Sequence, residues 1–186
     1  WEKAFRDSLF QIVSIITTTG FVSADYTSWG NALTMLFFVL LFLGACAGST
    51  SGGIKLIRHL VFFKNSFLEF KRILHPRAVI PLKLNGQVVT GRILTHIIIF
   101  LLLYMILFVI GSIVVAALGL EFTTAVGATA TALGNVGPGI GGVGPVDNFA
   151  WLSPPIKFVL SILMLLGRLE LFTILVLFTP YFWKSN

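Results

Sequence analysis

The chain has 186 residues, of which 56% are hydrophobic and only 11% are charged. A soluble domain is about 45–50% apolar and about 25% charged, so this composition predicts a membrane protein and argues against an ordinary soluble domain. The single cysteine, Cys46, excludes an internal disulfide framework and a cysteine-built zinc site. The chain begins with Trp1 rather than Met, and we expect it to be a piece of a longer protein.

The net charge of +6 does not indicate nucleic-acid binding, because the basic residues gather in one segment. Eight of the 13 Lys and Arg residues lie between positions 55 and 92, where Glu69 is the one acidic residue. A basic loop between apolar spans faces the cytoplasm, so lipid headgroups are its expected partner. Residues 121–155 carry two acidic residues and no basic one, which predicts an external segment.

Three apolar runs are long enough to cross a bilayer as helices. Residues 26–54 and 93–120 contain no Asp, Glu, Lys or Arg, and residues 156–183 contain only three charges before position 184. A membrane about 30 Å thick needs about 20 apolar residues in a helix. The sequence therefore predicts spans near residues 30–54, 93–119 and 154–180.

Two shorter apolar segments, 4–29 and 121–151, have matching patterns. Each has a short helical stretch, then a Gly-containing loop, then a Trp before the next span. Phe5 lies 15 residues before Gly20, as Phe122 lies 15 before Gly137. This pattern indicates a duplicated helix–pore loop–helix unit in an all-α membrane protein, with the first copy lacking its first helix.

The loops that follow the short helices are candidates for an ion filter. A short helix that stops inside the membrane points the negative end of its dipole at the membrane centre, and a loop after it can turn carbonyl oxygens toward a cation. The alternative is a loop that only packs. The candidate filter residues are Thr18, Thr19, Gly20, Phe21, Asn135, Val136, Gly137 and Pro138; among them Thr18, Thr19, Gly20, Asn135, Val136 and Gly137 are expected to bind K⁺.

The first span runs into a stretch of small residues, 44–53, that will not readily hold a straight helix. Aligning Trp29 with Trp151 places Arg168 opposite Cys46, inside this stretch. A guanidinium at membrane depth needs a partner or water, and an unwound loop offers carbonyls, so the two together predict a gate below the filter. The alternatives are a small-residue packing face and an Arg168 ion pair that only holds the bundle. The candidate gate residues are Gly44, Cys46, Gly48, Ser49, Thr50, Ser51, Gly52, Gly53 and Arg168.

The cytoplasmic segment has a local structure of its own. A helix with Phe62 and Phe67 among basic residues should follow the membrane surface and end before Pro76. Asn85-Gly86 predicts the turn of a hairpin over residues 79–89. The three His residues lack metal-ligand spacing, and no nucleophile pattern occurs, so we expect no enzyme and no cofactor.

The motifs 17–21, 44–55, 75–86 and 134–139, in this order, resemble Trk/Ktr-type potassium uptake transporters, in particular their TrkH-like pore-forming subunit. The resemblance implies potassium-channel-like architecture with four fused pore units. It implies a third unit at 1–75, a cytoplasmic link at 76–92 and a fourth unit at 93–186. Potassium is then the transported ligand, and residues 44–53 with Arg168 form the gate.

The resemblance also implies partners and a location. These are the lipid bilayer, N-terminal pore units of the parent chain, a second copy in a homodimer, and a cytosolic nucleotide-binding regulatory subunit (TrkA-like) at the cytoplasmic link. The location is the bacterial cytoplasmic (inner) membrane, with several passes. Two other functions remain open from the residues: a secondary transporter with a midplane substrate site at 44–53, and a membrane scaffold that transports nothing.

Overall fold

The computed structural model describes residues 1–46, 48–49, 51–78, 80–169 and 183 of the chain. These residues are mostly helical, with two short strand pairs. In chain order the elements are α1 (Glu2–Ile16), the 3-10 turn η1 (Tyr26–Trp29), α2 (Asn31–Leu40), β1 (Leu43–Gly44), β2 (Ile54–Lys55), α3 (Leu56–Leu74), β3 (Lys83–Leu84), β4 (Gln87–Val88), α4 (Gly91–Ala117), α5 (Phe122–Gly134), η2 (Gly141–Val143) and α6 (Pro154–Arg168).

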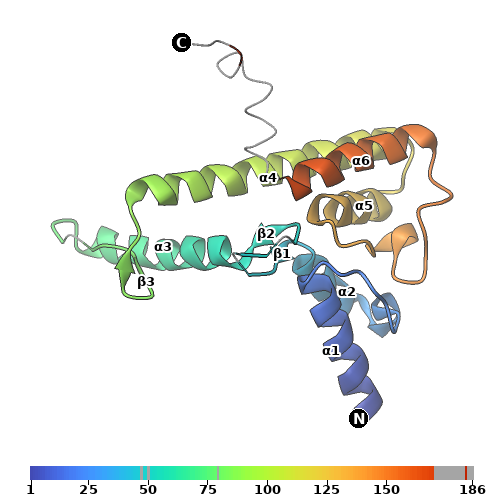
Figure 1. The fold of residues 1–186 in the computed structure, drawn as a ribbon, viewed down its shortest axis with the longest axis horizontal. Coiled ribbons are helices and arrows are strands. Elements are labelled where there is room, and N and C mark those ends of the chain that lie inside the picture. Colours follow the sequence, from blue (N-terminus) through green and yellow to red (C-terminus); the bar gives the residue numbers. More distant parts are fainter. Residues whose placement is uncertain (47, 50, 79, 170–182, 184–186) are drawn as a thin grey trace.

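Helix α4 runs along the upper edge of the ribbon in Figure 1, with α6 beside it and the other helices below. Within the described residues it is the one helix long and apolar enough to cross a membrane, and its 27 residues give a length of about 40 Å. Figure 1 shows α3 beside its first half and α5 and α6 beside its second half. Aliphatic side chains along α4, such as Leu102, Ile106 and Ile113, remain exposed, as expected for a surface that faces lipid or further helices.

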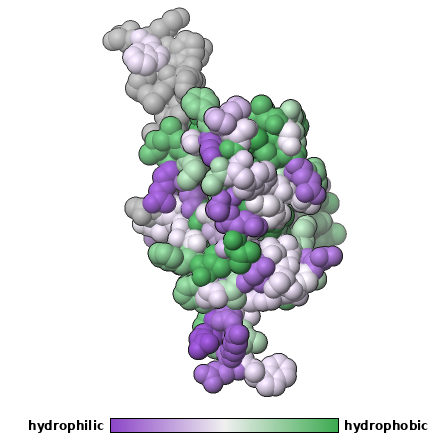
Figure 2. All heavy atoms as spheres, turned by 90° about the vertical axis from the view of Figure 1, so that its right-hand side faces the viewer, coloured by the Kyte–Doolittle hydropathy of each residue, from purple (hydrophilic) through white to green (hydrophobic). Residues whose placement is uncertain are grey.

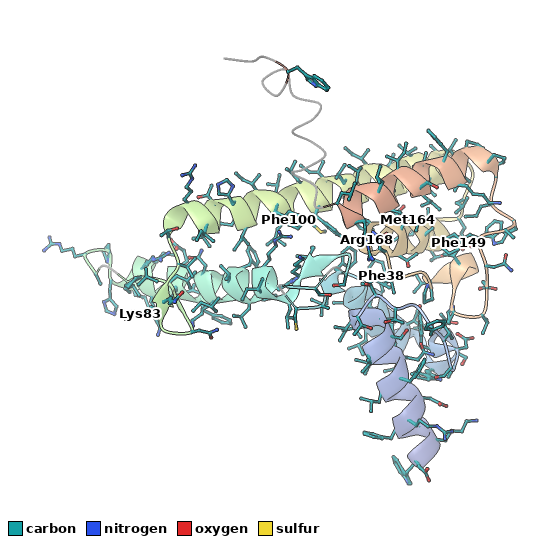
Figure 3. The ribbon with its side chains drawn as sticks, viewed as in Figure 1. Phe38, Lys83, Phe100, Phe149, Met164 and Arg168 are labelled. Carbon is teal, nitrogen blue, oxygen red and sulfur yellow. The ribbon has the colours of Figure 1, made fainter. Side chains whose placement is uncertain are left out.

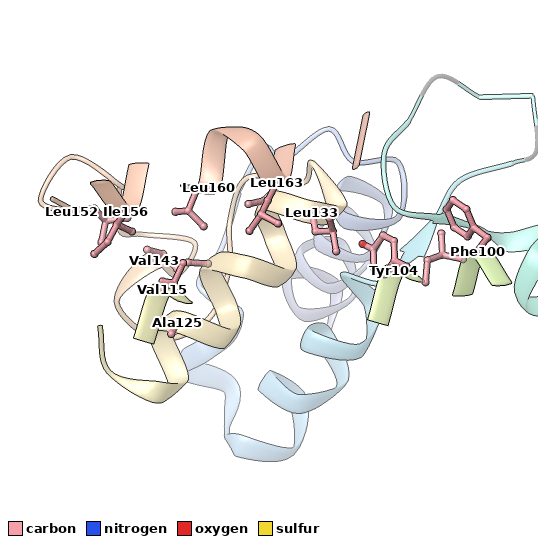
Figure 4. Close-up of a cluster of buried hydrophobic side chains, with 13 residues drawn as sticks. Phe100, Tyr104, Val115, Ala125, Leu133, Val143, Leu152, Ile156, Leu160 and Leu163 are labelled. Carbon is pink, nitrogen blue, oxygen red and sulfur yellow. The ribbon is translucent and has the colours of Figure 1, made fainter. Parts of the chain in front are cut away.

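The main core lies where α4, α5 and α6 pack together (Figure 4). Gly111 of α4 makes the close approach possible, because a Cβ atom there would lie 2.9 Å from Leu163 Cδ1 and 3.0 Å from Thr129 Cγ2. Leu133 and Val115 are fully buried in this cluster. Gly111 therefore lets α4 pack closely against both α5 and α6.

The predicted first span is broken, as its small-residue stretch indicated, but its helix ends earlier than predicted. Helix α2 has only ten residues and ends at Leu40, before the small-residue stretch begins. The chain then forms a parallel pair in which Leu43 lies opposite Ile54 and Gly44 opposite Lys55. Pairing removes these residues from the helical ladder, so the chain leaves the helix direction at β1 and becomes helical again only after β2, as α3. The break itself was predicted, but it begins earlier than the glycines suggest.

In the basic segment between α2 and α4, the end of the helix and the turn of the hairpin agree with the sequence prediction. Helix α3 ends at Leu74, two residues before Pro76. In the hairpin, Leu84 pairs with Gln87, and the turn residues Asn85 and Gly86 have φ values of 49° and 82°. The two paired strands are shorter than predicted, with two residues each.

A cation–π contact joins α3 to α4. The Arg58 guanidinium of α3 lies 3.9 Å from the centre of the Phe100 ring of α4, which holds the two helices together. Figure 3 labels Phe100 and, in the hairpin, Lys83.

The two ends of the chain differ in how much the structure describes. Helix α1 points away from the other helices, and its free end is hydrophilic (Figure 2). The predicted third span begins with α6, and its part beyond residue 169 lies outside the described residues.

Candidate functional site

The first loop begins where α1 ends, and its amide groups turn back toward that helix. The N–H of Thr18 donates to the Ile15 carbonyl at 3.0 Å. The N–H groups of Thr19 and Gly20 donate to the Ser14 carbonyl at 2.9 and 3.4 Å. Thr18 and Gly20 have positive φ values, 54° and 77°, whereas Thr19 between them does not. Alternating signs of φ keep successive carbonyls on one side of a chain instead of on alternating sides.

The second loop repeats this backbone pattern 117 residues later, position by position. Asn135 N–H donates to the Ala132 carbonyl at 3.1 Å, and Val136 N–H donates to the Thr131 carbonyl at 3.1 Å. Asn135 and Gly137 have positive φ values, 55° and 114°, as Thr18 and Gly20 do. Two sequences with few identical residues thus adopt the same turn at the end of a short helix.

A hydroxyl residue six positions before each filter glycine holds its loop. Ser14 Oγ donates to the Phe21 carbonyl at 2.6 Å, and Thr131 Oγ1 accepts from Gly137 N–H at 2.9 Å. Both side chains are almost fully buried. Neither Ser14 nor Thr131 was predicted to belong to the site. Their equal spacing from Gly20 and Gly137 is the sequence signal from which they could have been predicted.

The backbone oxygens of the residues expected to bind K⁺ differ from that of Phe21, because they accept no hydrogen bond from the described residues. Within the described part of the chain, none of the six residues expected to bind K⁺ accepts a hydrogen bond at its backbone oxygen. Their six N–H groups all donate to the preceding helix end. Backbone groups at membrane depth without partners require water, an ion or further protein.

The two loops lie against each other. A Cβ atom added to Gly20 would collide with the Val136 carbonyl oxygen and lie 3.4 Å from Pro138 Cδ. At Gly137, an added Cβ would lie 3.9 Å from the Gly20 Cα atom. The structure therefore brings six of the eight predicted filter residues into two adjacent loops of one conformation; Phe21 is exposed and Pro138 is buried at their margins.

Side chains behind the loops connect them to the scaffold. Tyr26 Oη donates to the Gly139 carbonyl at 2.6 Å, and Gln11 Nε2 donates to the Ala24 carbonyl at 2.8 Å. Burial, with a smaller contribution from the neighbouring Asp25 charge, raises the pKa of Tyr26, so this hydroxyl stays protonated and remains a donor. Neither Tyr26 nor Gln11 was predicted to belong to the site.

The predicted gate segment ends against the C-terminal end of helix α5, and its start lies against its own end. A Cβ atom at Gly52 would collide with the Gly134 carbonyl, and a Cβ at Gly44 would lie 2.7 Å from the Gly52 carbonyl. Gly53 has a φ of 73°. Cys46 and Gly48 are exposed, with nothing within 4 Å of a Cβ at Gly48. Among the predicted gate residues, Thr50 lies outside the described residues; Ser49 and Ser51 are half-buried and joined by a hydrogen bond.

The C-terminal end of α6 also lies against the C-terminal end of α5. A Cβ atom at Gly167 would collide with the Leu133 carbonyl, and the Asn135 side chain donates to the Met164 carbonyl at 2.9 Å. Arg168 is the last residue of α6 and is exposed (Figure 3). In the part of the chain that the structure describes, its guanidinium makes no hydrogen bond, so its predicted role stays a prediction. Glu170, the alternative ion-pair partner, lies outside the described residues.

The described residues contain no group of three or more His, Cys, Asp or Glu side chains placed to hold a metal ion together. Backbone carbonyls and hydroxyls are therefore the oxygen atoms that this site offers.

Facing loops rich in free carbonyls, carried on short helices beside a long apolar helix, define a helical membrane protein with a candidate cation site. A family model for the TrkH cation transport proteins matches residues 2–185. The chain belongs to this family, which is one of transport proteins and not of enzymes.

Relatives with known names agree. The chain is 42% identical over 180 residues to the Trk system potassium uptake protein TrkH of Salmonella typhimurium, and 41% identical over 177 residues to TrkI of Halomonas elongata. These matches cover 97% and 95% of the chain but only 37% and 36% of the relatives. The crystal structure of the potassium transporter TrkH from Vibrio parahaemolyticus matches with a TM-score of 0.90 at 39% identity, over 98% of this chain and 39% of that one. The chain thus spans little more than a third of the proteins that it matches.

Proposed function

We propose that this chain supplies two neighbouring pore units of a bacterial potassium uptake transporter, and that K⁺ passes along the carbonyl oxygens of its two loops. The observation that carries the proposal is the division of backbone groups in both loops. Six N–H groups donate to the helix ends, and six carbonyl oxygens accept nothing within the described residues. Oxygen atoms arranged in this way can replace the hydration shell of a cation without adding a charge.

The number of units follows from the geometry of the loops. Two loops in contact form part of a ring, and a ring of carbonyls around one ion needs about four. The relatives are long enough to provide the rest, because this chain covers only 37% of them. We assign residues 1–75 and 93–186 to two duplicated units of potassium-channel-like architecture, joined by a link at 76–92. Their equal loop conformations at an offset of 117 residues support this duplication.

An open face beside the second loop fits a further unit. A cavity of about 420 Å³ is lined there by Thr131, Ala132, Gly137, Phe149, Lys157, Leu160, Ser161 and Met164. On the first unit, the corresponding side of the loop is covered by Ala130 and Val136, which pack against Ile15 and Leu41. If the units repeat around the pore, the next unit covers the cavity in the same way.

The gate proposal rests on where two segments meet. Gly52 near the end of the segment 44–53 and Gly167 at the end of α6 both lie against backbone carbonyls at the C-terminal end of α5. That end carries the second loop, so the contacts of Gly52 and Gly167 support a gate, formed by the segment 44–53 and Arg168, that obstructs the ion path. A fixed positive charge there opposes the passage of K⁺.

Location and partners follow the same reasoning. We propose several passes through the cytoplasmic membrane, with the basic segment of α3 and the β3–β4 hairpin on the cytoplasmic side. The exposed hairpin is then available to a cytosolic regulatory subunit, and a second copy of the transporter completes the assembly. Potassium enters this scheme as the transported ligand.

The test is rescue of bacteria that lack potassium uptake, with a full-length transporter that contains this chain. Growth at low potassium, together with uptake that discriminates K⁺ from Na⁺, is the expected result. Saturable uptake of an organic substrate would instead support a secondary transporter. Good expression without uptake of K⁺ or of an organic substrate would contradict both transport functions and support a membrane scaffold.

A further inference from the structure

One side chain connects the two loop regions through the protein and not through the pore. Tyr26 follows the first loop in the chain, and its hydroxyl donates to the carbonyl of Gly139, just after the second loop, at 2.6 Å. The two residues are 113 positions apart. Within the described residues, this is the one side-chain hydrogen bond from the first loop region to the second.

Tyr26 is held rigidly by its surroundings. It is 0% exposed, and its ring stacks on Phe37 of α2 with centroids 4.6 Å apart. Trp29 packs edge-on against the same Phe37 ring at 5.8 Å. The backbone around Tyr26 is fixed as well, because Asp25 caps the η1 turn by accepting from Thr27 N–H at 2.9 Å. The hydroxyl therefore has one position from which to donate.

Gly139, the acceptor, is equally constrained. Its N–H donates to the Val143 carbonyl at 2.8 Å, and a Cβ atom there would lie 3.0 Å from the Gly127 carbonyl. Gly139 is thus bonded at both its N–H, to η2, and its carbonyl, to Tyr26. Between Gly139 and the loop carbonyls stands only Pro138, a residue with a fixed φ that transmits the orientation of one peptide to the next.

We infer that Tyr26 is a positioning residue for the second loop: by fixing the Gly139 peptide, it sets the spacing of the Val136 and Gly137 carbonyls relative to the first loop. This inference rests on the proposed function and adds a determinant of ion discrimination that lies outside the pore. Discrimination between cations depends on how firmly carbonyl oxygens are held at a given spacing. A bond of this kind contributes without touching the ion.

The experiment compares two Tyr→Phe variants in the full-length transporter. Tyr26→Phe removes the bonded hydroxyl and keeps the stacked ring. Tyr104→Phe is the matched control, because Tyr104 is 1% exposed and its hydroxyl has no hydrogen-bond partner among the described residues. Uptake of K⁺ and Na⁺ is measured per folded protein for each. Tyr26→Phe should lower the K⁺ over Na⁺ ratio by roughly fivefold, the effect of one net hydrogen bond, and Tyr104→Phe should leave it unchanged.

Other outcomes overturn the inference in distinct ways. An unchanged ratio in Tyr26→Phe, with normal uptake by the wild type, would show that the bond is only structural. No K⁺ uptake by the wild type would refute the proposed function instead. If Tyr26→Phe does not fold, 4-aminophenylalanine at position 26 retains the ring and an N–H donor. That variant should keep the wild-type ratio, and a loss there would contradict a positioning role.

Discussion

The side-chain amide of Asn135 donates a hydrogen bond to the Met164 carbonyl at 2.9 Å. Asn135 is the first residue of the second loop and has a left-handed backbone, with φ 55° and ψ 38°. Met164 lies in α6, four residues before Arg168. One residue therefore joins the proposed filter to the helix that carries the proposed gate. Thr18, at the equivalent position of the first loop, has no such bond within the described residues.

This difference makes Thr18 a matched control for Asn135. Asn135→Gly keeps the left-handed backbone available and removes the bond to Met164, so it should destabilise the folded protein by about 1 kcal/mol and raise Na⁺ uptake. Thr18→Gly removes no bond and relieves a left-handed backbone at a β-branched residue, so stability should stay equal or rise. Thermal unfolding and ion uptake of both variants provide the measurement. Equal effects at the two positions would show that the Asn135 bond contributes nothing particular.

A second prediction concerns the contact between the two loops. Gly20→Ala places a methyl group where the Val136 carbonyl lies, and it also strains a backbone with φ 77°. We expect K⁺ over Na⁺ discrimination to fall, because the Val136 carbonyl must move. Gly30→Ala is the control, since Gly30 has a φ of 109° with nothing within 4 Å of its Cβ position. Both variants carry a backbone strain of about 1–3 kcal/mol, but only Gly20→Ala displaces a loop carbonyl. Loss of discrimination in both would assign the effect to general destabilisation.

The sequence was enough to predict the elements whose signals are local. The end of α1 at residues 17–21, the end of α5 at 134–139 and the Asn85-Gly86 hairpin were all predicted, because Gly and Asn mark the left-handed positions where a helix or strand ends. The fold class was predicted from the charge-free runs. What could not be predicted depends on residues far apart in the chain.

Two features illustrate this limit. The end of α2 at Leu40 depends on the pairing of Leu43 with Ile54, and no propensity near residue 40 indicates it. The Tyr26–Gly139 bond joins residues 113 apart, and a single Tyr after a loop carries no signal of its partner. The placement of Arg168 beside the gate segment came from aligning two tryptophans, and it remains a prediction.

A third prediction tests the orientation in the membrane. With Cys46 first replaced by Ser, because it is exposed, a cysteine at Asn85 should react with an impermeant reagent only from the cytoplasmic side. A cysteine at Asp147 should react only from outside. The reason is the eight basic residues between positions 55 and 92, which favour the cytoplasm. Labelling of intact cells and of inverted vesicles distinguishes the two sides. The reverse labelling pattern would contradict the proposed orientation and, with it, the placement of the filter loops in the membrane.

A fourth prediction tests the contact that holds the segment 44–53 against α5. Gly52 lies against the Gly134 carbonyl, so Gly52→Ala must push the segment away from α5. If the segment obstructs the ion path, K⁺ flux per folded protein should rise severalfold. Gly48→Ala lies in the same segment, where an added Cβ meets nothing within 4 Å, and should leave flux unchanged. A rise of K⁺ flux in both variants would indicate general loosening of the segment rather than loss of the Gly52 contact with α5.

The last prediction concerns Arg168, the exposed last residue of α6. It directly follows Gly167, which lies against the Leu133 carbonyl. If this charge and the segment 44–53 form one obstruction, Arg168→Ala should raise cation flux and weaken its dependence on a cytosolic regulator. Deleting residues 48–51 should do the same, and the two changes together should add little, because each disables part of one unit. If Arg168 only anchors the bundle, its removal should lower stability and flux per folded protein together. Flux measured against the amount of folded protein separates the two roles, and a fall in that ratio would rule out the gate.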